Sequence, residues 1–203
     1  MRLRYDFDVE KLVQAIAYMS SSGVAGLDKL KIVKLLFLAD KQHLLEVGRP
    51  ILGDWYSCMP YGPVPSQSYN IIRDVIDADP EMKPIAEARF NEFFKIDRSR
   101  THPALVAQKA PDLDIFSDSE VAALDNTIQS YGKFTGADLI KLTHNDPIWA
   151  IPDKGRKGWS SVEIPFELFF EVNGADEMLE FARAQQENRD FDSALSYEAT
   201  QAN

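Results

Sequence analysis

The chain has 203 residues, 45% hydrophobic and 11% aromatic, enough for one globular core with room for a terminal appendage. Its formal net charge of -10 argues against non-specific binding to the phosphate backbone of nucleic acids. Half of that excess lies in residues 175–203, where seven acids face two arginines, so the acidity either attracts a basic protein partner or serves solubility alone.

Two helices are predicted at the start of the chain, over residues 8–21 and 28–47. Apolar residues recur at near-helical spacing in the first. The second ends at Gly48 and contains residues 32–39, which are apolar on nearly every side. This second helix is therefore expected to be central and buried.

The stretch from residue 48 to 66 is predicted to be a pre-ordered connector with a short strand over 54–59. It holds four prolines, each of which fixes its own φ and keeps the preceding residue out of the α region. A rigid connector can display Trp55, Tyr56 and Tyr61 as a contact surface at low entropic cost. The alternative is a well-packed turn whose aromatic rings complete the core.

Capping residues, breakers and apolar spacing predict the remaining elements. Helices are expected from Pro65 to before Pro80, from the capping box at Ser117 to Gly132, after the cap Thr135, and over 175–186. Strands are expected over 89–97, 104–108 and 159–171, and the chain beyond Asn188 is expected to be frayed. The predicted fold is mainly α, of the α+β class. It comprises a helical domain (residues 1–174) with a central buried helix and a small antiparallel sheet, followed by an acidic segment (175–203).

The motifs of familiar catalytic sites are missing from the sequence, including the P-loop, the His-Glu-x-x-His zinc motif and the nucleophile elbow. Cys58 is the single cysteine, so an intramolecular disulfide is excluded. It is either a small buried hydrophobe or a nucleophile that needs a base from elsewhere in the chain. With no signal peptide and no membrane-length apolar run, the protein is expected in the cytoplasm.

A row of polar residues along the second helix is a second candidate site. Asp40, His43 and Glu46 recur every three residues and are either metal ligands or a salt-bridged stripe. His144 either forms a polar site with Asp146 or satisfies carbonyl groups at a helix end.

Lys34 lies in the most apolar part of the second helix. A buried ammonium group needs a carboxylate or carbonyl partner, and Asp54 is one candidate. The alternative is a lysine at the edge of the core, with its stem covered and its charge in water.

These residues also carry a family resemblance. The matching motifs are Leu30-x-x-x-Lys34-Leu35-Leu36-Phe37-x-Ala39-Asp40-x-x-His43-Leu44, Gly48-Arg49-Pro50-Ile51, Gly53-Asp54-x-Tyr56, Met59-Pro60-Tyr61-Gly62-Pro63-Val64, Ser117-x-x-Glu120, and Leu142-Thr143-His144 followed by Trp149. In this order they resemble the Panacea domain of SocA-like antitoxins from bacteria and phages, over about residues 29–170. Phe37, where Tyr is frequent, and Cys58, where Ala is common, depart from the pattern in ways that suit a core.

The resemblance implies an antitoxin that neutralises a protein toxin, usually encoded beside it, by contact rather than by chemistry. Such a protein needs no cofactor and no metal. The candidate contact residues are Trp55, Tyr56, Tyr61, Pro63 and Trp149. The acidic segment after Ala175 lies outside the resemblance and is a rival contact region for a basic toxin.

Two other functions are compatible with the sequence. One is an enzyme that reverses a toxin's modification, with a site around Lys34, Asp40, His43 and Asp54. The other is a transcriptional autorepressor, which the acidic charge and the lack of a recognisable basic recognition helix disfavour.

Overall fold

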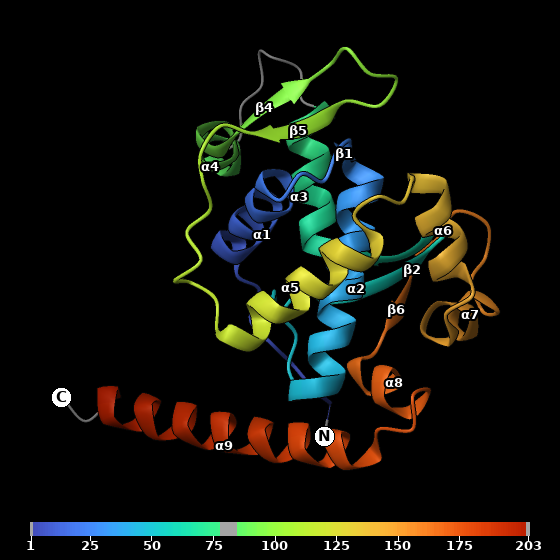
Figure 1. Cartoon of the computed structure of the whole chain (residues 1–203). Coiled ribbons are helices and arrows are strands. Elements are labelled where there is room, and N and C mark those ends of the chain that lie inside the picture. Colours follow the sequence, from blue (N-terminus) through green and yellow to red (C-terminus); the bar gives the residue numbers. More distant parts are fainter. Residues whose placement is uncertain (1, 78–84, 202–203) are drawn as a thin grey trace.

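The computed structural model describes residues 2–77 and 85–201 and shows a mostly helical α+β fold, as predicted (Figure 1). The helices are α1 (Val9–Ser21), α2 (Lys29–Val47), α3 (Ser66–Asp77), α4 (Ile85–Phe93), α5 (Asp118–Tyr131), α6 (Gly136–His144), α7 (Pro147–Asp153), α8 (Phe166–Glu171) and α9 (Asp176–Gln201). The strands are β1 (Leu27–Asp28), β2 (Tyr56–Met59), β3 (Gly62–Pro65), β4 (Phe94–Asp97), β5 (Ala104–Ala107) and β6 (Val162–Ile164).

Within the described residues, the strands form two small antiparallel sheets of three strands each. The first sheet has the order β1-β5-β4 and lies near one end of α2. The second sheet has the order β3-β2-β6 and lies alongside α2 (Figure 1). In the second sheet, Tyr56 pairs with Pro65 on one side and with Ile164 on the other. The sheet therefore links the connector to a segment about a hundred residues later in the chain.

Helix α2 is the central element of the fold, as expected. Its start is capped by Asp28, whose carboxylate accepts a hydrogen bond from Lys31 N, and it ends at Gly48 in the left-handed conformation (φ 80°). Helices α3, α5, α6, α8 and α9 all contact it. A helix surrounded in this way buries nearly every face, which explains why residues 32–39 are apolar on almost all sides.

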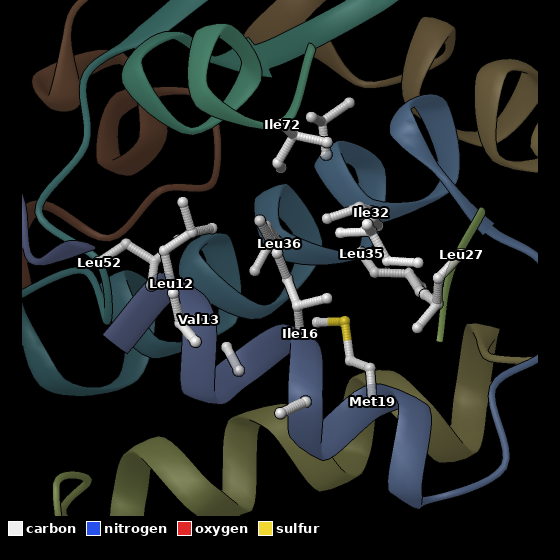
Figure 2. Close-up of a cluster of buried hydrophobic side chains, with 14 of the residues drawn as sticks. Leu12, Val13, Ile16, Met19, Leu27, Ile32, Leu35, Leu36, Leu52 and Ile72 are labelled. Carbon is white, nitrogen blue, oxygen red and sulfur yellow. The ribbon is translucent and has the colours of Figure 1, made fainter. Parts of the chain in front are cut away.

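Two apolar clusters fill the interior. The larger one joins α1, α2, α3 and the first sheet, and Figure 2 shows its centre, where Leu12 and Ile16 of α1 lie near Leu36 of α2. The smaller cluster holds Phe37 of α2 against Tyr56 and against residues of α8 and α9. Since α2 contributes to both clusters, the position of the connector that follows it is tied to the whole core.

The predicted strand over residues 89–97 is wrong in its first half. Helix α4 runs to Phe93, and β4 begins only at Phe94. Phe90 and Phe93 are both buried, and their i, i+3 spacing fits one face of a helix. Pro80, the expected stop of the third helix, lies outside the described residues, and α3 ends at Asp77.

The predicted strand over residues 159–171 is wrong beyond Ile164. Pro165 (φ -67°, ψ 146°) ends the sheet and begins α8, in which Phe166, Phe169 and Phe170 are buried. The predicted end of the last helix at residue 186 is also wrong, because α9 continues to Gln201.

Candidate partner-binding site

Asp40 of α2 anchors the first part of the connector (residues 48–66). Its side chain is 1% exposed, and its carboxylate accepts hydrogen bonds from Ile51 N (2.8 Å), Leu52 N (3.3 Å) and the Tyr56 hydroxyl (2.7 Å). Burial raises the pKa of Asp40 to about 7, although these three hydrogen bonds act in the opposite direction. The connector is therefore fixed to the central helix through one buried polar group.

Asp54 anchors the connector to the next helix. Its buried carboxylate accepts hydrogen bonds from Gln67 N (3.0 Å), Ser68 N (2.7 Å) and Ser68 Oγ (2.8 Å). The two backbone groups belong to the first turn of α3, where N–H groups have no partner within the helix. Burial raises the pKa of Asp54, and the hydrogen bonds oppose that rise.

Lys34 is buried beneath the tip of the hairpin formed by β2 and β3, and its partner is a backbone carbonyl group rather than the candidate Asp54. Its side chain is 0% exposed, and Nζ donates a hydrogen bond to the backbone oxygen of Pro63 (2.7 Å). A Cβ on Gly62 (φ 103°) would lie 2.6 Å from this Nζ, so glycine leaves room for the ammonium group. Burial lowers the pKa of Lys34 to about 7. Such burial also excludes the alternative of a lysine whose charge reaches water.

The contact residues predicted in the connector divide into buried and exposed ones. Tyr56 (1% exposed) and Pro63 lie in the interior, which corrects their assignment as contact residues. Tyr56 faces inward with Cys58, because alternate residues of a strand share a face. Trp55 (47% exposed) and Tyr61 (55% exposed) remain at the surface.

A second exposed ring, which was not among the predicted contact residues, lies against Tyr61. Trp159 is 77% exposed, and its ring meets that of Tyr61 edge to face, with 5.9 Å between centroids and 60° between planes. Both rings line a mostly apolar pocket of about 390 Å³, together with Val33, Met59 and Tyr69. The polar loop over residues 153–158 followed by a tryptophan was the available signal for this residue.

Trp149 supports the β2–β3 hairpin next to its turn and is only partly exposed. Its Nε1 donates a hydrogen bond to the Met59 backbone oxygen (2.8 Å), and its ring stacks on His144 at 4.0 Å and 2°. The predicted His144–Asp146 site does not form, since Asp146 accepts hydrogen bonds from Lys41 and from the first turn of α7. Burial lowers the pKa of His144, which favours the neutral ring.

Helix α2, the connector and the segment up to α7 coincide with a match to a known family. The model described as Antitoxin SocA-like, Panacea domain matches residues 32–150, more than half of the chain. The chain belongs to this SocA-like antitoxin family. Neither a curated protein nor a solved structure gives a significant match. The resemblance predicted from sequence motifs is thus confirmed.

The Panacea match contains one ring of the exposed aromatic pair and excludes the other. Tyr61 lies within residues 32–150, whereas Trp159 and the helices α1, α8 and α9 lie outside them. In the part of the chain that the structure describes, no helix is long and apolar enough to cross a membrane.

The polar row on α2 of this Panacea domain is engaged in hydrogen bonds. His43 is 0% exposed, with Nδ1 2.7 Å from the Arg49 backbone oxygen and Nε2 3.0 Å from Ser119 Oγ. Glu46 is exposed and accepts a hydrogen bond from Gln42. Across residues 2–77 and 85–201, no group of three or more His, Cys, Asp or Glu side chains is placed to hold a metal ion.

Cys58 lies on the inner face of β2, with Sγ 3.7 Å from the Trp149 backbone oxygen. Burial, together with the negative charge of Asp153, raises the pKa of this thiol to about 11. Since the thiolate is the nucleophilic form, a thiol with this pKa has little reactivity near neutral pH.

The separation of Lys34 from Asp54 gives a first testable expectation. A double-mutant cycle of Lys34→Met and Asp54→Ala, followed by urea unfolding, should give a coupling energy within about 0.5 kcal/mol of zero. Asp54→Ala should be the more destabilising change, because it leaves three donors at the start of α3 unpaired. A coupling energy of about 2 kcal/mol or more would show that the two charges interact after all.

Proposed function

We propose that this protein is an antitoxin that neutralises a cognate toxin, encoded by an adjacent gene, through direct binding and without catalysis. Tyr61 and Trp159 form the centre of the contact surface, and Trp55 extends it. The observation that carries the proposal is the pair of exposed rings at the margin of an apolar pocket. Tyrosine and tryptophan beside a pocket are typical of residues that dominate the binding energy of protein interfaces.

The hydrogen bonds that hold the connector in place also favour a binding function. The connector that carries Tyr61 is fixed by Asp40 at one end and Asp54 at the other, and the interior beneath its tip is filled by Lys34. Trp149 adds a hydrogen bond to the Met59 backbone, two residues before Tyr61. A surface already ordered in the free protein loses little conformational entropy when it binds.

The alternative of an enzyme that reverses a toxin's modification receives no specific support from the geometry. Its four residues, Lys34, Asp40, His43 and Asp54, are each at most 1% exposed, and each is hydrogen-bonded to the connector or to a helix. Lys34 is also among the residues that line the apolar pocket, but its Nζ is engaged by the Pro63 backbone oxygen. We place the antitoxin in the cytoplasm, the reducing compartment that suits its single unpaired cysteine.

Co-expression with the neighbouring gene tests the proposal. If that gene encodes the toxin, the protein should restore growth and co-purify with the toxin as a complex. The matched variant is Trp159→Ala, whose fold should be intact because the side chain is largely exposed. Restored growth without any complex would reject direct neutralisation.

A further inference from the structure

A second hollow, of about 560 Å³, lies next to the apolar pocket and has a different character. It is formed by the loop before β1, the loop between β4 and β5, and the turn that joins α5 to α6. The basic side chains that line it are Lys31, Arg100, His102 and Lys133. Asp28 is the one carboxylate in its lining, so the side chains of Lys31, Arg100 and Lys133 outnumber the acidic groups three to one. In a chain with a net charge of -10, this local excess of positive charge is informative.

Lys31 supplies a buried ammonium group to this basic hollow. The residue is 7% exposed, and Nζ donates hydrogen bonds to the backbone oxygens of Ala25 (3.0 Å) and Gly132 (2.8 Å). Burial lowers the pKa of Lys31; the negative charge of Asp28 opposes this effect, and Arg100 adds to it. Both hydrogen-bond acceptors are neutral backbone oxygens, and an ammonium group has three donors. These two hydrogen bonds therefore neither neutralise the charge of Lys31 nor use all of its donors. Within the described residues no carboxylate forms an ion pair with Lys31.

Arg100 and Lys133 add two exposed cations to the same hollow. The guanidinium group of Arg100 lies over Gly26 (φ 65°), where a Cβ would be 3.1 Å from Nη1. Neither side chain has an ion-pair partner among the residues that the structure describes. The nearby capping box of α6 is already satisfied, since Asp138 accepts hydrogen bonds from Thr135 N and Oγ. The three cationic side chains, rather than this helix end, therefore define the site.

We propose that the basic hollow binds the phosphate groups of a small phosphorylated molecule. The planar guanidinium group of Arg100 can donate two parallel hydrogen bonds to a phosphate, while the two lysines act as point charges around it. A group with two negative charges neutralises this excess of three cations over one carboxylate more completely than a single carboxylate would. The volume of the hollow is in the range of pockets that hold small ligands.

This site is independent of the toxin contact, but the two are adjacent. Asp28 and His102 line both the basic hollow and the apolar pocket at whose margin Tyr61 and Trp159 lie. The phosphorylated ligand would therefore be bound beside the proposed contact surface. Its binding can be measured without any toxin, so the outcome does not depend on the proposed function.

The test is a calorimetric titration of the full chain with sodium pyrophosphate and, separately, with ATP. Sodium chloride at equal ionic strength is the reference. Equal affinity for the two ligands would show that the phosphate groups alone are recognised, and affinity at least tenfold higher for ATP would show that the nucleoside also makes contacts. Either result supports the site.

Substitutions identify the residues responsible. Arg100→Gln should weaken binding of both ligands at least about tenfold, because charge-assisted hydrogen bonds are lost, and Lys133→Gln should weaken it about threefold. Both side chains are exposed, so the fold should be unaffected. Lys157→Gln, an exposed lysine outside the hollow, is the matched control and should bind like the wild type. Heats no larger than those of the chloride reference, or unchanged affinity in an Arg100→Gln/Lys133→Gln double variant, would overturn the proposal.

Discussion

Replacing Asp40 with alanine should destabilise the protein by about 3 kcal/mol, measured as the free energy of unfolding in urea. The change leaves Ile51 N, Leu52 N and the Tyr56 hydroxyl without their buried acceptor. Each unpaired buried donor costs on the order of 1–3 kcal/mol, and local relaxation recovers part of the sum. Asp114→Ala, at an exposed position, is the control and should change stability by less than about 0.5 kcal/mol.

The pH dependence of the same site follows from the raised pKa of Asp40. This pKa is about 7 in the folded protein, against an ordinary value of 3.8 that applies to the unfolded chain. Between these values the folded state keeps a proton that the unfolded state has released, so its stability falls as the pH rises from about 4 to about 7. Asp40→Asn lacks this titration. The stability of the wild type relative to Asp40→Asn should therefore decrease across that window, and a constant difference would contradict the assignment.

Truncating either exposed ring of the contact surface should weaken toxin binding by at least about 2 kcal/mol, or roughly thirtyfold. Tyr61→Ala and Trp159→Ala remove the two halves of one edge-to-face pair, so their effects should not be additive. Affinity should change little between low and high salt, because apolar contacts in a pocket are not screened. The measurement is a binding titration of each variant at two salt concentrations.

The rival contact region is the acidic helix α9, and a matched pair of variants separates it from the connector. Phe191→Ala removes a ring that is 64% exposed on α9 and should bind like the wild type. Replacing Glu177, Glu180 and Glu187 with glutamine should likewise leave affinity unchanged. A truncation at Gly174 is less suitable, because Leu179 and Ala182 of α9 are buried in the smaller core cluster. If the triple glutamine variant binds the toxin more weakly, chiefly because its association rate at low salt is lower, then α9 contacts the toxin.

The parts of the fold that were predictable from the sequence are those fixed by local signals. The cap at Asp28 and the left-handed Gly48 mark the two ends of α2, and the capping box at Ser117 marks the start of α5. Each of these signals acts within a few residues of the chain, so no knowledge of distant partners is needed to interpret it.

The predicted secondary structure was wrong where one spacing of apolar residues fits both a strand and a helix. The apolar residues at positions 164, 166, 168 and 170 alternate as they would in a strand. Phe166, Phe169 and Phe170 are nevertheless buried together in a short helix, because Pro165 ends the sheet after Ile164. The alternation alone could not distinguish the strand from the helix.

The candidate site was only partly predictable, because partners distant in sequence complete it. The burial of Lys34 was one of two alternatives that its apolar neighbours allowed, and its acceptor, the Pro63 carbonyl, is set by the hairpin geometry. The inward face of Tyr56 could have been inferred from the strand period it shares with Cys58. Trp159 could not be joined to Tyr61 from sequence, since the two are far apart in the chain and meet only because β6 pairs with β2.

The central claim, direct binding without turnover, is tested by titrating a fixed amount of toxin with this protein in a cell-free assay of toxin activity. Residual toxin activity should fall linearly and reach its minimum at a fixed molar ratio that does not change with incubation time. Trp159→Ala should need a larger excess to reach the same minimum. Complete loss of toxin activity at a small fraction of the toxin's molar amount, progressing with time, would contradict the account and indicate an enzyme.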